Sequence, residues 1–154
     1  MVKTIEALTL ACTSFNLNTL VMKRPVATSP INKILIVDDD PAANYLTKEL
    51  LLSMNVAKEI EVAENCLRAL ELLKNSNCAD VILLDIKMPG IDGFDFLERL
   101  KGLDLKKKVK VFMLTSSLRA EDKLKAFSFR AVIDYFEKPL TVDMVQMVKA
   151  TYLN

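Results

Sequence analysis

Short apolar runs alternate with longer segments of helical spacing from Lys33 onward. Because the runs are bounded by polar or turn residues, they predict five strands, at Ile34–Val37, Ile60–Ala63, Val81–Asp85, Val109–Leu114 and Val132–Phe136. The segments between and after them predict five helices, at Pro41–Leu52, Asn65–Lys74, Phe94–Lys101, Arg119–Phe127 and Val142–Leu153. Five such units predict an α/β fold with a parallel sheet and helices on both faces.

The second strand differs from its neighbours, because charged and apolar residues alternate along Glu59–Val62. Alternation is typical of an edge strand, so we expect the order 2-1-3-4-5 of the flavodoxin-like arrangement. Helix boundaries agree with this division. Asp40 is placed to cap the first helix, Gly102 follows the third, and Thr141 precedes the last.

One domain is expected at residues 32–154. The chain has 154 residues, of which 51% are hydrophobic, enough for a single core. Residues 1–31 lack a strong period and carry Lys23-Arg24-Pro25 and Thr28-Ser29-Pro30, which predicts a flexible or added extension. The chain stops at Asn154, just after the last predicted helix, so we expect no attached output domain and signalling through protein contacts.

Charge and cysteine content exclude several classes of protein. With 21 basic and 20 acidic residues, no overall field attracts nucleic acid or an anionic membrane. Three cysteines without a CxxC pair, and no histidine, indicate neither a disulfide framework nor a zinc site. The cysteine pattern favours a reducing cytoplasm. No apolar run approaches the roughly 18 residues of a membrane span, so a soluble protein is expected. The basic cluster Lys106–Lys108 with Lys110 is typical of a solvated loop.

Polar residues follow four of the five predicted strands. They are Asp38–Asp40, Asp85, Thr115 and Lys138. The carboxyl ends of parallel strands share one edge of the sheet, so the carboxylates should lie in one pocket and repel one another unless a cation joins them. Mg²⁺ is the expected ion, because it accepts a few carboxylate oxygens and works with phosphates. Thr115 and Lys138 would then supply a hydroxyl and a positive charge for phosphoryl oxygens.

These residues also resemble a known family. The motifs are Val37-Asp38-Asp39-Asp40-Pro41, Leu84-Asp85 with Met88-Pro89-Gly90 and Asp92-Gly93, Thr115-Ser116, and Tyr135 with Lys138-Pro139. In this order and spacing they resemble a response-regulator receiver domain. The resemblance implies that Asp85 accepts a phosphoryl group from a histidine kinase or a histidine phosphotransfer protein, and that the chain signals to a downstream protein target without being an enzyme in any wider sense.

Further roles follow from the resemblance. It implies that Asp38, Asp39, Asp85 and the backbone carbonyl of Lys87 hold Mg²⁺, and that Tyr135 changes rotamer on activation. It also implies a cis peptide before Pro139. The fourth helix, fifth strand and fifth helix are the expected switching face, and a homodimer is compatible with the sequence.

The chain departs from the family pattern at two places, and a separate pair of residues beside the pocket bears on how long the phosphoryl group survives. Arg130-Ala131 and Cys66 stand where receivers commonly carry glycine, so the loop before the fifth strand is expected to differ in shape. Lys87 and Ser117 flank the pocket, and neither offers a carboxylate or amide to orient a hydrolytic water. We therefore expect slow self-dephosphorylation.

Two alternatives remain open. An aspartyl-nucleophile phosphatase of the haloacid dehalogenase type needs Asp-x-Asp-x-Thr after one strand, and neither Asp38–Ala42 nor the segment after Asp85 supplies that threonine. An unphosphorylated receiver-like scaffold would be expected to have lost one of the acidic pair, Thr115 or Lys138, and all of these are present.

Overall fold

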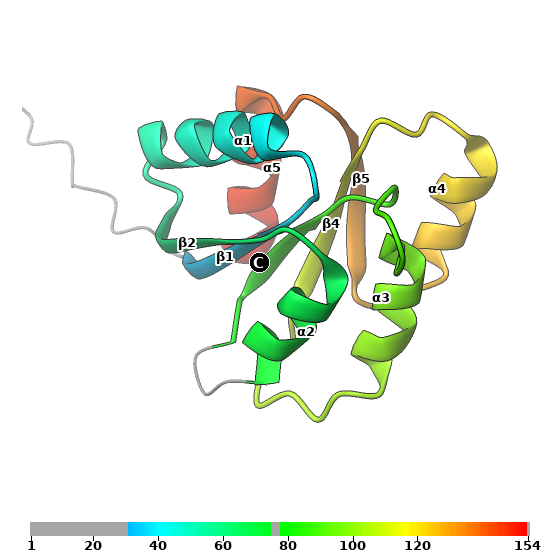
Figure 1. Cartoon of the computed structure of the whole chain (residues 1–154). Coiled ribbons are helices and arrows are strands. Elements are labelled where there is room, and N and C mark those ends of the chain that lie inside the picture. The colour runs from blue at the N-terminus through cyan, green and yellow to red at the C-terminus, as the bar shows by residue number, and fades with distance from the viewer. Residues whose placement is uncertain (1–30, 75–77, 154) are drawn as a thin grey trace, which may run out of the picture.

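The computed structural model describes residues 31–74 and 78–153, in which five strands alternate with five helices (Figure 1). The strands are β1 (Ile31–Val37), β2 (Ala57–Ala63), β3 (Val81–Leu84), β4 (Lys110–Thr115) and β5 (Val132–Glu137). The helices are α1 (Pro41–Ser53), α2 (Cys66–Lys74), α3 (Gly93–Lys101), α4 (Ala120–Phe127) and α5 (Val142–Leu153).

All five strands are parallel and lie in the order β2-β1-β3-β4-β5, as the sequence predicts. The alternating strand, β2, is at one edge, and β5 is at the other. The loops that leave β3, β4 and β5 lie above the middle of Figure 1, whereas the loop from α3 into β4 crosses the bottom. Residues at the strand ends are therefore gathered at one side of the sheet.

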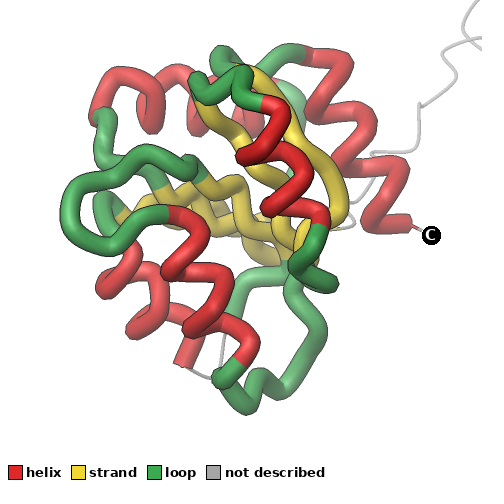
Figure 2. Tube along the Cα trace, turned by 90° about the vertical axis from the view of Figure 1, so that its right-hand side faces the viewer, coloured by secondary structure: helices red, strands yellow, loops and turns green. Residues whose placement is uncertain are grey.

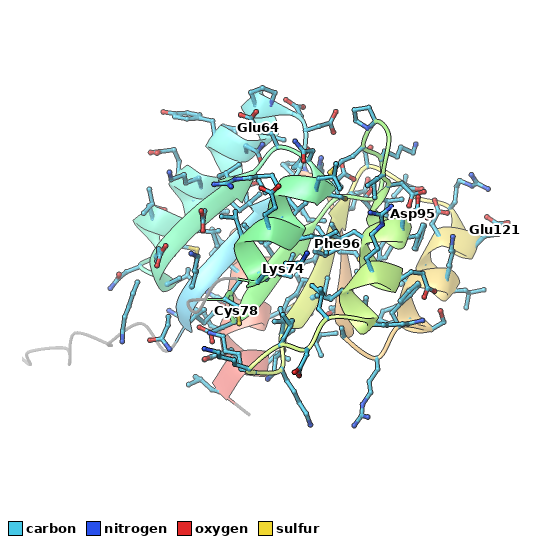
Figure 3. The ribbon with its side chains drawn as sticks, turned by 60° about the horizontal axis from the view of Figure 1, so that its bottom comes forward. Glu64, Lys74, Cys78, Asp95, Phe96 and Glu121 are labelled. Carbon is cyan, nitrogen blue, oxygen red and sulfur yellow. The ribbon has the colours of Figure 1, made fainter. Side chains whose placement is uncertain are left out.

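Helices cover both faces of the sheet. Helices α2, α3 and α4 pack with one buried cluster, and α1 and α5 pack with the other, so the strands are enclosed between two layers (Figure 2). Successive residues of β3 alternate between these clusters: Ile82 faces the first and Leu83 the second. Two-sided burial explains why β3 is an unbroken apolar run. Phe96 of α3, which is fully buried, belongs to the first layer (Figure 3).

Helix ends follow the predicted capping residues. Asp40 Oδ1 accepts hydrogen bonds from the backbone N–H groups of Ala42 (2.9 Å) and Ala43 (3.3 Å). Thr141 Oγ1 accepts one from Met144 N at 3.4 Å, at the start of α5. Each interaction satisfies a donor that has no partner inside its own helix. Gly102 is the C-cap of α3, as predicted.

Two strands, β1 and β2, begin earlier than their apolar runs indicate. β1 starts at Ile31 rather than Ile34, and β2 at Ala57 rather than Ile60, while β3 ends at Leu84, directly before Asp85. The early start of β1 includes the last residue of the predicted extension; residues 1–30 lie outside the described part. In the described residues, no helix is long and apolar enough to cross a membrane.

Candidate functional site

Lys138 joins the ends of three strands. Its Nζ lies 2.6 Å from Asp38 Oδ2, after β1, and 2.7 Å from Asp85 Oδ2, after β3. Lys138 itself follows β5, and the peptide bond to Pro139 is cis, as predicted. Asp38 and Asp85 are 3% and 5% exposed, so both carboxylates interact with the ammonium group largely shielded from water.

The loop after β3 holds Asp85 from the other side. Asp85 Oδ1 accepts hydrogen bonds from the backbone N–H groups of Ile86 (2.6 Å) and Lys87 (3.3 Å). Gly93 N donates to Ile86 O at 2.9 Å, which folds the loop back onto the strand end. A Cβ at Gly93 would lie 2.3 Å from the backbone oxygen of Asp85, so only glycine permits this approach.

Asp38 is positioned by a residue that the sequence analysis did not identify. Asn44, at the end of the first turn of α1, donates from Nδ2 to the backbone oxygen of Asp38 at 2.8 Å, and both residues are buried. Asp38 Oδ1 also accepts from Asp40 N at 3.0 Å. A signal was present: Asn44 and Thr47 are polar, yet they share the inner stripe of α1 with Leu51.

Three carboxylates lie close together here, and the ammonium group of Lys138 pairs with two of them, Asp38 and Asp85. Asp38, Asp39 and Asp85 each place an oxygen within 4.8 Å of the others. Burial foremost raises the pKa of Asp38 above its ordinary value, and the charge of Asp85 adds to this, although Lys138 acts to lower it. Burial acts to lower the pKa of Lys138, but its bonds to Asp38 and Asp85 outweigh burial and raise it. The surplus of negative charge and the all-oxygen donor set fit a hard divalent cation such as Mg²⁺.

A chain of hydrogen bonds leads from Thr115 to α4 and β5. Thr115 is fully buried, and its Oγ1 accepts from Ser117 N at 3.2 Å. Ser117 Oγ donates to Asp122 Oδ2 at 2.5 Å, in the first turn of α4, and Ser117 O accepts from the Tyr135 hydroxyl at 2.8 Å. Ser117 is thus turned into the protein, and Asp122 is a partner that the sequence analysis missed.

An open pocket of about 520 Å³ lies between the loop that follows Asp85, at residues 86–88, and the start of α4. Lys87, whose side chain is exposed, lines it together with Arg119 and Asp122.

The predicted site residues fall into two groups. Asp38, Asp39, Asp85 and Lys138 are in one cluster, whereas Thr115, Ser117 and Tyr135 form a hydrogen-bonded chain at the end of β4. The roles of individual residues in binding a metal or a phosphoryl group stay predictions.

The two departures from the glycine pattern lie directly before or at the start of an element, Arg130-Ala131 before β5 and Cys66 at the start of α2. Cys66 begins α2, and its Sγ donates to Asp92 O at 3.5 Å. Burial foremost raises the pKa of the Cys66 thiol to about 12, so this thiol is protonated at neutral pH. Arg130 and Ala131 lie in the turn between α4 and β5, and the register of β5 against β4 shifts just after this turn, between Val111 and Phe112 of β4.

Comparisons with known proteins agree with this geometry. A family described as the response regulator receiver domain matches residues 34–150. A protein-glutamate methylesterase/protein-glutamine glutaminase of Thiobacillus denitrificans is 36% identical over 107 residues, which are 70% of this chain and 29% of that protein. The chain therefore spans under a third of this relative's length.

Solved structures give the same result. The crystal structure of a two component response regulator from Cytophaga hutchinsonii matches with a TM-score of 0.74 and 30% sequence identity. The match covers 80% of this chain and 98% of the chain in that structure. The Mn²⁺-bound form of response regulator Rcp1 has a TM-score of 0.64 and 29% identity, with coverages of 77% and 90%. The match over most of the chain shows that it belongs to the response-regulator receiver family of two-component systems.

Proposed function

We propose that the chain is the phosphoacceptor of a cytoplasmic two-component phosphorelay, and that Asp85 takes a phosphoryl group from a phosphohistidine of a kinase or phosphotransfer partner. The observation that carries the proposal is the bridge of Lys138 Nζ between Asp38 Oδ2 and Asp85 Oδ2. A buried carboxylate held between an ammonium group and backbone N–H groups is oriented for attack on phosphorus.

In the proposed transfer, a carboxylate oxygen of Asp85 forms the new O–P bond as the P–N bond to the partner's imidazole breaks. The imidazole nitrogen keeps the electron pair and is protonated within the partner's site. Lys138 stays beside the reacting group and offsets its negative charge. Thr115 Oγ1 accepts from Ser117 N, so its own O–H proton is available for a phosphoryl oxygen.

Asp38, Asp39 and Asp85, with the backbone carbonyl of Lys87, are the residues that would hold Mg²⁺. The ion would supply positive charge to the oxygens of the transferring group. The Mn²⁺-bound form of the related regulator Rcp1 supports a divalent-cation site in this chain. The match to the Thiobacillus methylesterase covers only 29% of that protein, so it supports the receiver function and not an esterase activity of this chain.

The signal is proposed to leave through the surface formed by α4, β5 and α5. Leu124 and Phe127 of α4 and Met147 of α5 are exposed apolar side chains on these elements. A phosphoryl group that draws Thr115 toward it would disturb the bond from Ser117 N, and with it the contact to Tyr135. Tyr135 is therefore the proposed switch, and a downstream protein or a second copy of the chain is the proposed receiver of the signal.

Incubation with acetyl phosphate, with and without Mg²⁺, tests the proposal. Intact mass spectrometry should show one added phosphoryl group that requires Mg²⁺ and is absent from Asp85→Asn protein. Asp95→Asn is a matched control, because Asp95 is exposed and lies on α3 away from the Lys138 bridge. Labelling of Asp85→Asn equal to wild type would refute the assignment of Asp85. No labelling of the wild type, by acetyl phosphate or by a phosphorylated histidine protein, would favour the unphosphorylated scaffold.

A further inference from the structure

A second concave surface lies at the opposite end of the sheet from Asp85. It is a groove of about 800 Å³ between the loop from α3 to β4, residues 102–109, and the turn from α4 to β5, residues 128–131. The first of these loops runs along the lower edge of Figure 3. Lys110, at the start of β4, lines the groove, whereas Thr115 ends that strand, a separation of about 16 Å. The groove therefore lies apart from the phosphoryl pocket, the site formed by Asp38, Asp39, Asp85 and Lys138.

The interior of the groove is apolar. Buried Phe129 and partly exposed Leu103 and Leu105 line it, as does Ile133, which is 37% exposed at the outer edge of β5. Ala131, one of the residues that replace the usual glycine, also contributes to this lining. An apolar surface that remains open to solvent favours a ligand with at least one apolar side chain.

The rim of the groove is strongly basic. Its lining includes six basic side chains and one acidic side chain, although the whole chain has a net charge of only +1. Lys107 is drawn inward by Asp80, whose Oδ1 lies 2.6 Å from its Nζ. Lys106, Lys108 and Arg130 are exposed, and none has an acidic partner among the described residues. Three cations without counter-charges are thus spread over both sides of the apolar interior.

We propose that this groove, lined by residues 102–109 and 128–131, binds an acidic peptide segment of a partner protein. An apolar side chain of the segment would occupy the interior, and its carboxylates would pair with Lys106, Lys108 and Arg130. Charge complementarity selects an acidic ligand, and the concave apolar interior selects an extended chain rather than a flat lipid surface. Nucleic acid is disfavoured, because the aromatic ring that lines the groove, Phe129, is buried and offers no face for stacking.

The test uses the full ¹⁵N-labelled chain and a short synthetic peptide in which glutamates alternate with leucines. At low salt the peptide should shift backbone amide signals of residues 103–109 and 128–131. It should bind about tenfold or more weakly to the variant Lys106→Glu/Lys108→Glu/Arg130→Glu. A peptide with serine in place of leucine should also bind more weakly, since it leaves the apolar interior unfilled.

A matched control separates this site from general charge attraction. The variant Lys48→Glu/Lys74→Glu/Lys123→Glu changes the net charge equally at exposed lysines outside the groove and should bind like wild type. Equal weakening in both variants, or equal binding of the serine peptide, would overturn the proposal. So would tighter binding of a DNA oligonucleotide or of phosphatidylglycerol vesicles. Labelling of Asp85 by acetyl phosphate checks that the groove variant is folded. If this variant does not fold, the wild-type spectrum decides: peptide-induced shifts that avoid residues 103–109 and 128–131 would overturn the proposal.

Discussion

Removal of the buried Asp80 side chain, directly before β3, is expected to destabilise the domain because the carboxylate bonds to the start of β1. Asp80 Oδ2 accepts hydrogen bonds from the backbone N–H groups of Asn32 (2.9 Å) and Lys33 (3.0 Å), and Oδ1 pairs with Lys107 at 2.6 Å. The residue is 5% exposed. One carboxylate therefore holds the beginning of β1 against β3.

The contacts of Asp80 allow the loss of unfolding free energy to be estimated for each variant. Hydrogen bonds to a charged group contribute about 1.5 kcal/mol or more each, so the two backbone bonds account for about 3 kcal/mol in Asp80→Ala. The Lys107 pair adds less than about 1 kcal/mol, because the Lys107 side chain is 36% exposed and screened by water. Asp80→Asn keeps a neutral acceptor for both N–H groups and should cost about half as much as Asp80→Ala.

Urea unfolding of Asp80→Ala, Asp80→Asn and Lys107→Met at pH 7 measures these differences. Asp80→Ala should lose the most unfolding free energy and Asp80→Asn less. Lys107→Met should lose the least, about 0.5 kcal/mol. Equal losses in Asp80→Ala and Lys107→Met would show that the ion pair, not the backbone bonds, stabilises the start of β1, and would refute the reasoning.

The pH dependence has a definite sign. Burial acts to raise the pKa of Asp80, but Lys107 and the backbone N–H groups outweigh burial and lower it below its ordinary value. A carboxylate with a lowered pKa in the folded state contributes its full stability above the unfolded value, about 3.9, and loses it as the pH falls through the folded value. The difference between wild type and Asp80→Ala should therefore shrink in acid below about pH 4. A difference that grows there would contradict this sign.

Other predictions concern the phosphoryl pocket. Gly93→Ala should reduce Mg²⁺-dependent labelling of Asp85, because its Cβ would displace the Asp85 backbone; labelling at the wild-type rate would contradict the close approach. The phosphoryl group should be long-lived in wild type and decay faster in Lys87→Asn/Ser117→Glu, where an amide and a carboxylate can orient water; unchanged decay would sink this idea. Phosphorylation should alter amide hydrogen exchange within residues 119–153, and identical exchange in both forms would exclude coupling to that face.

The sequence predicts the strands and the pocket well, because both depend on local pattern and on one topological rule. Apolar runs locate β3 and β4, and the shared edge of parallel strands then brings Asp38, Asp85 and Lys138 together without further information. The early start of β1 is different. It depends on Asp80, 48 residues away from Asn32, and a contact at that separation leaves no periodic signal in either segment.

Residues that support the site were missed for a similar reason. The bond from Asn44 Nδ2 to the Asp38 carbonyl and the bond from Ser117 Oγ to Asp122 both need a defined turn between the partners. Asn44 Oδ1 is buried and has no donor among the described residues, so the hydrogen bond from Nδ2 is the one that fixes this side chain. Its bond to Asp38 gives it a role in positioning the acidic pocket.

Helix α4 physically connects the phosphoryl pocket with the basic groove. Its first turn is bonded to Ser117 through Asp122, and its last residue, Phe127, leads into the turn that contributes Phe129 and Arg130 to the groove. A shift of α4 on phosphorylation would therefore change the shape of the groove as well. Coupling is reciprocal, so an acidic peptide that binds the phosphorylated form more tightly by some factor must favour phosphorylation by the same factor. A peptide that binds both forms equally would show that the two ends of the sheet act independently.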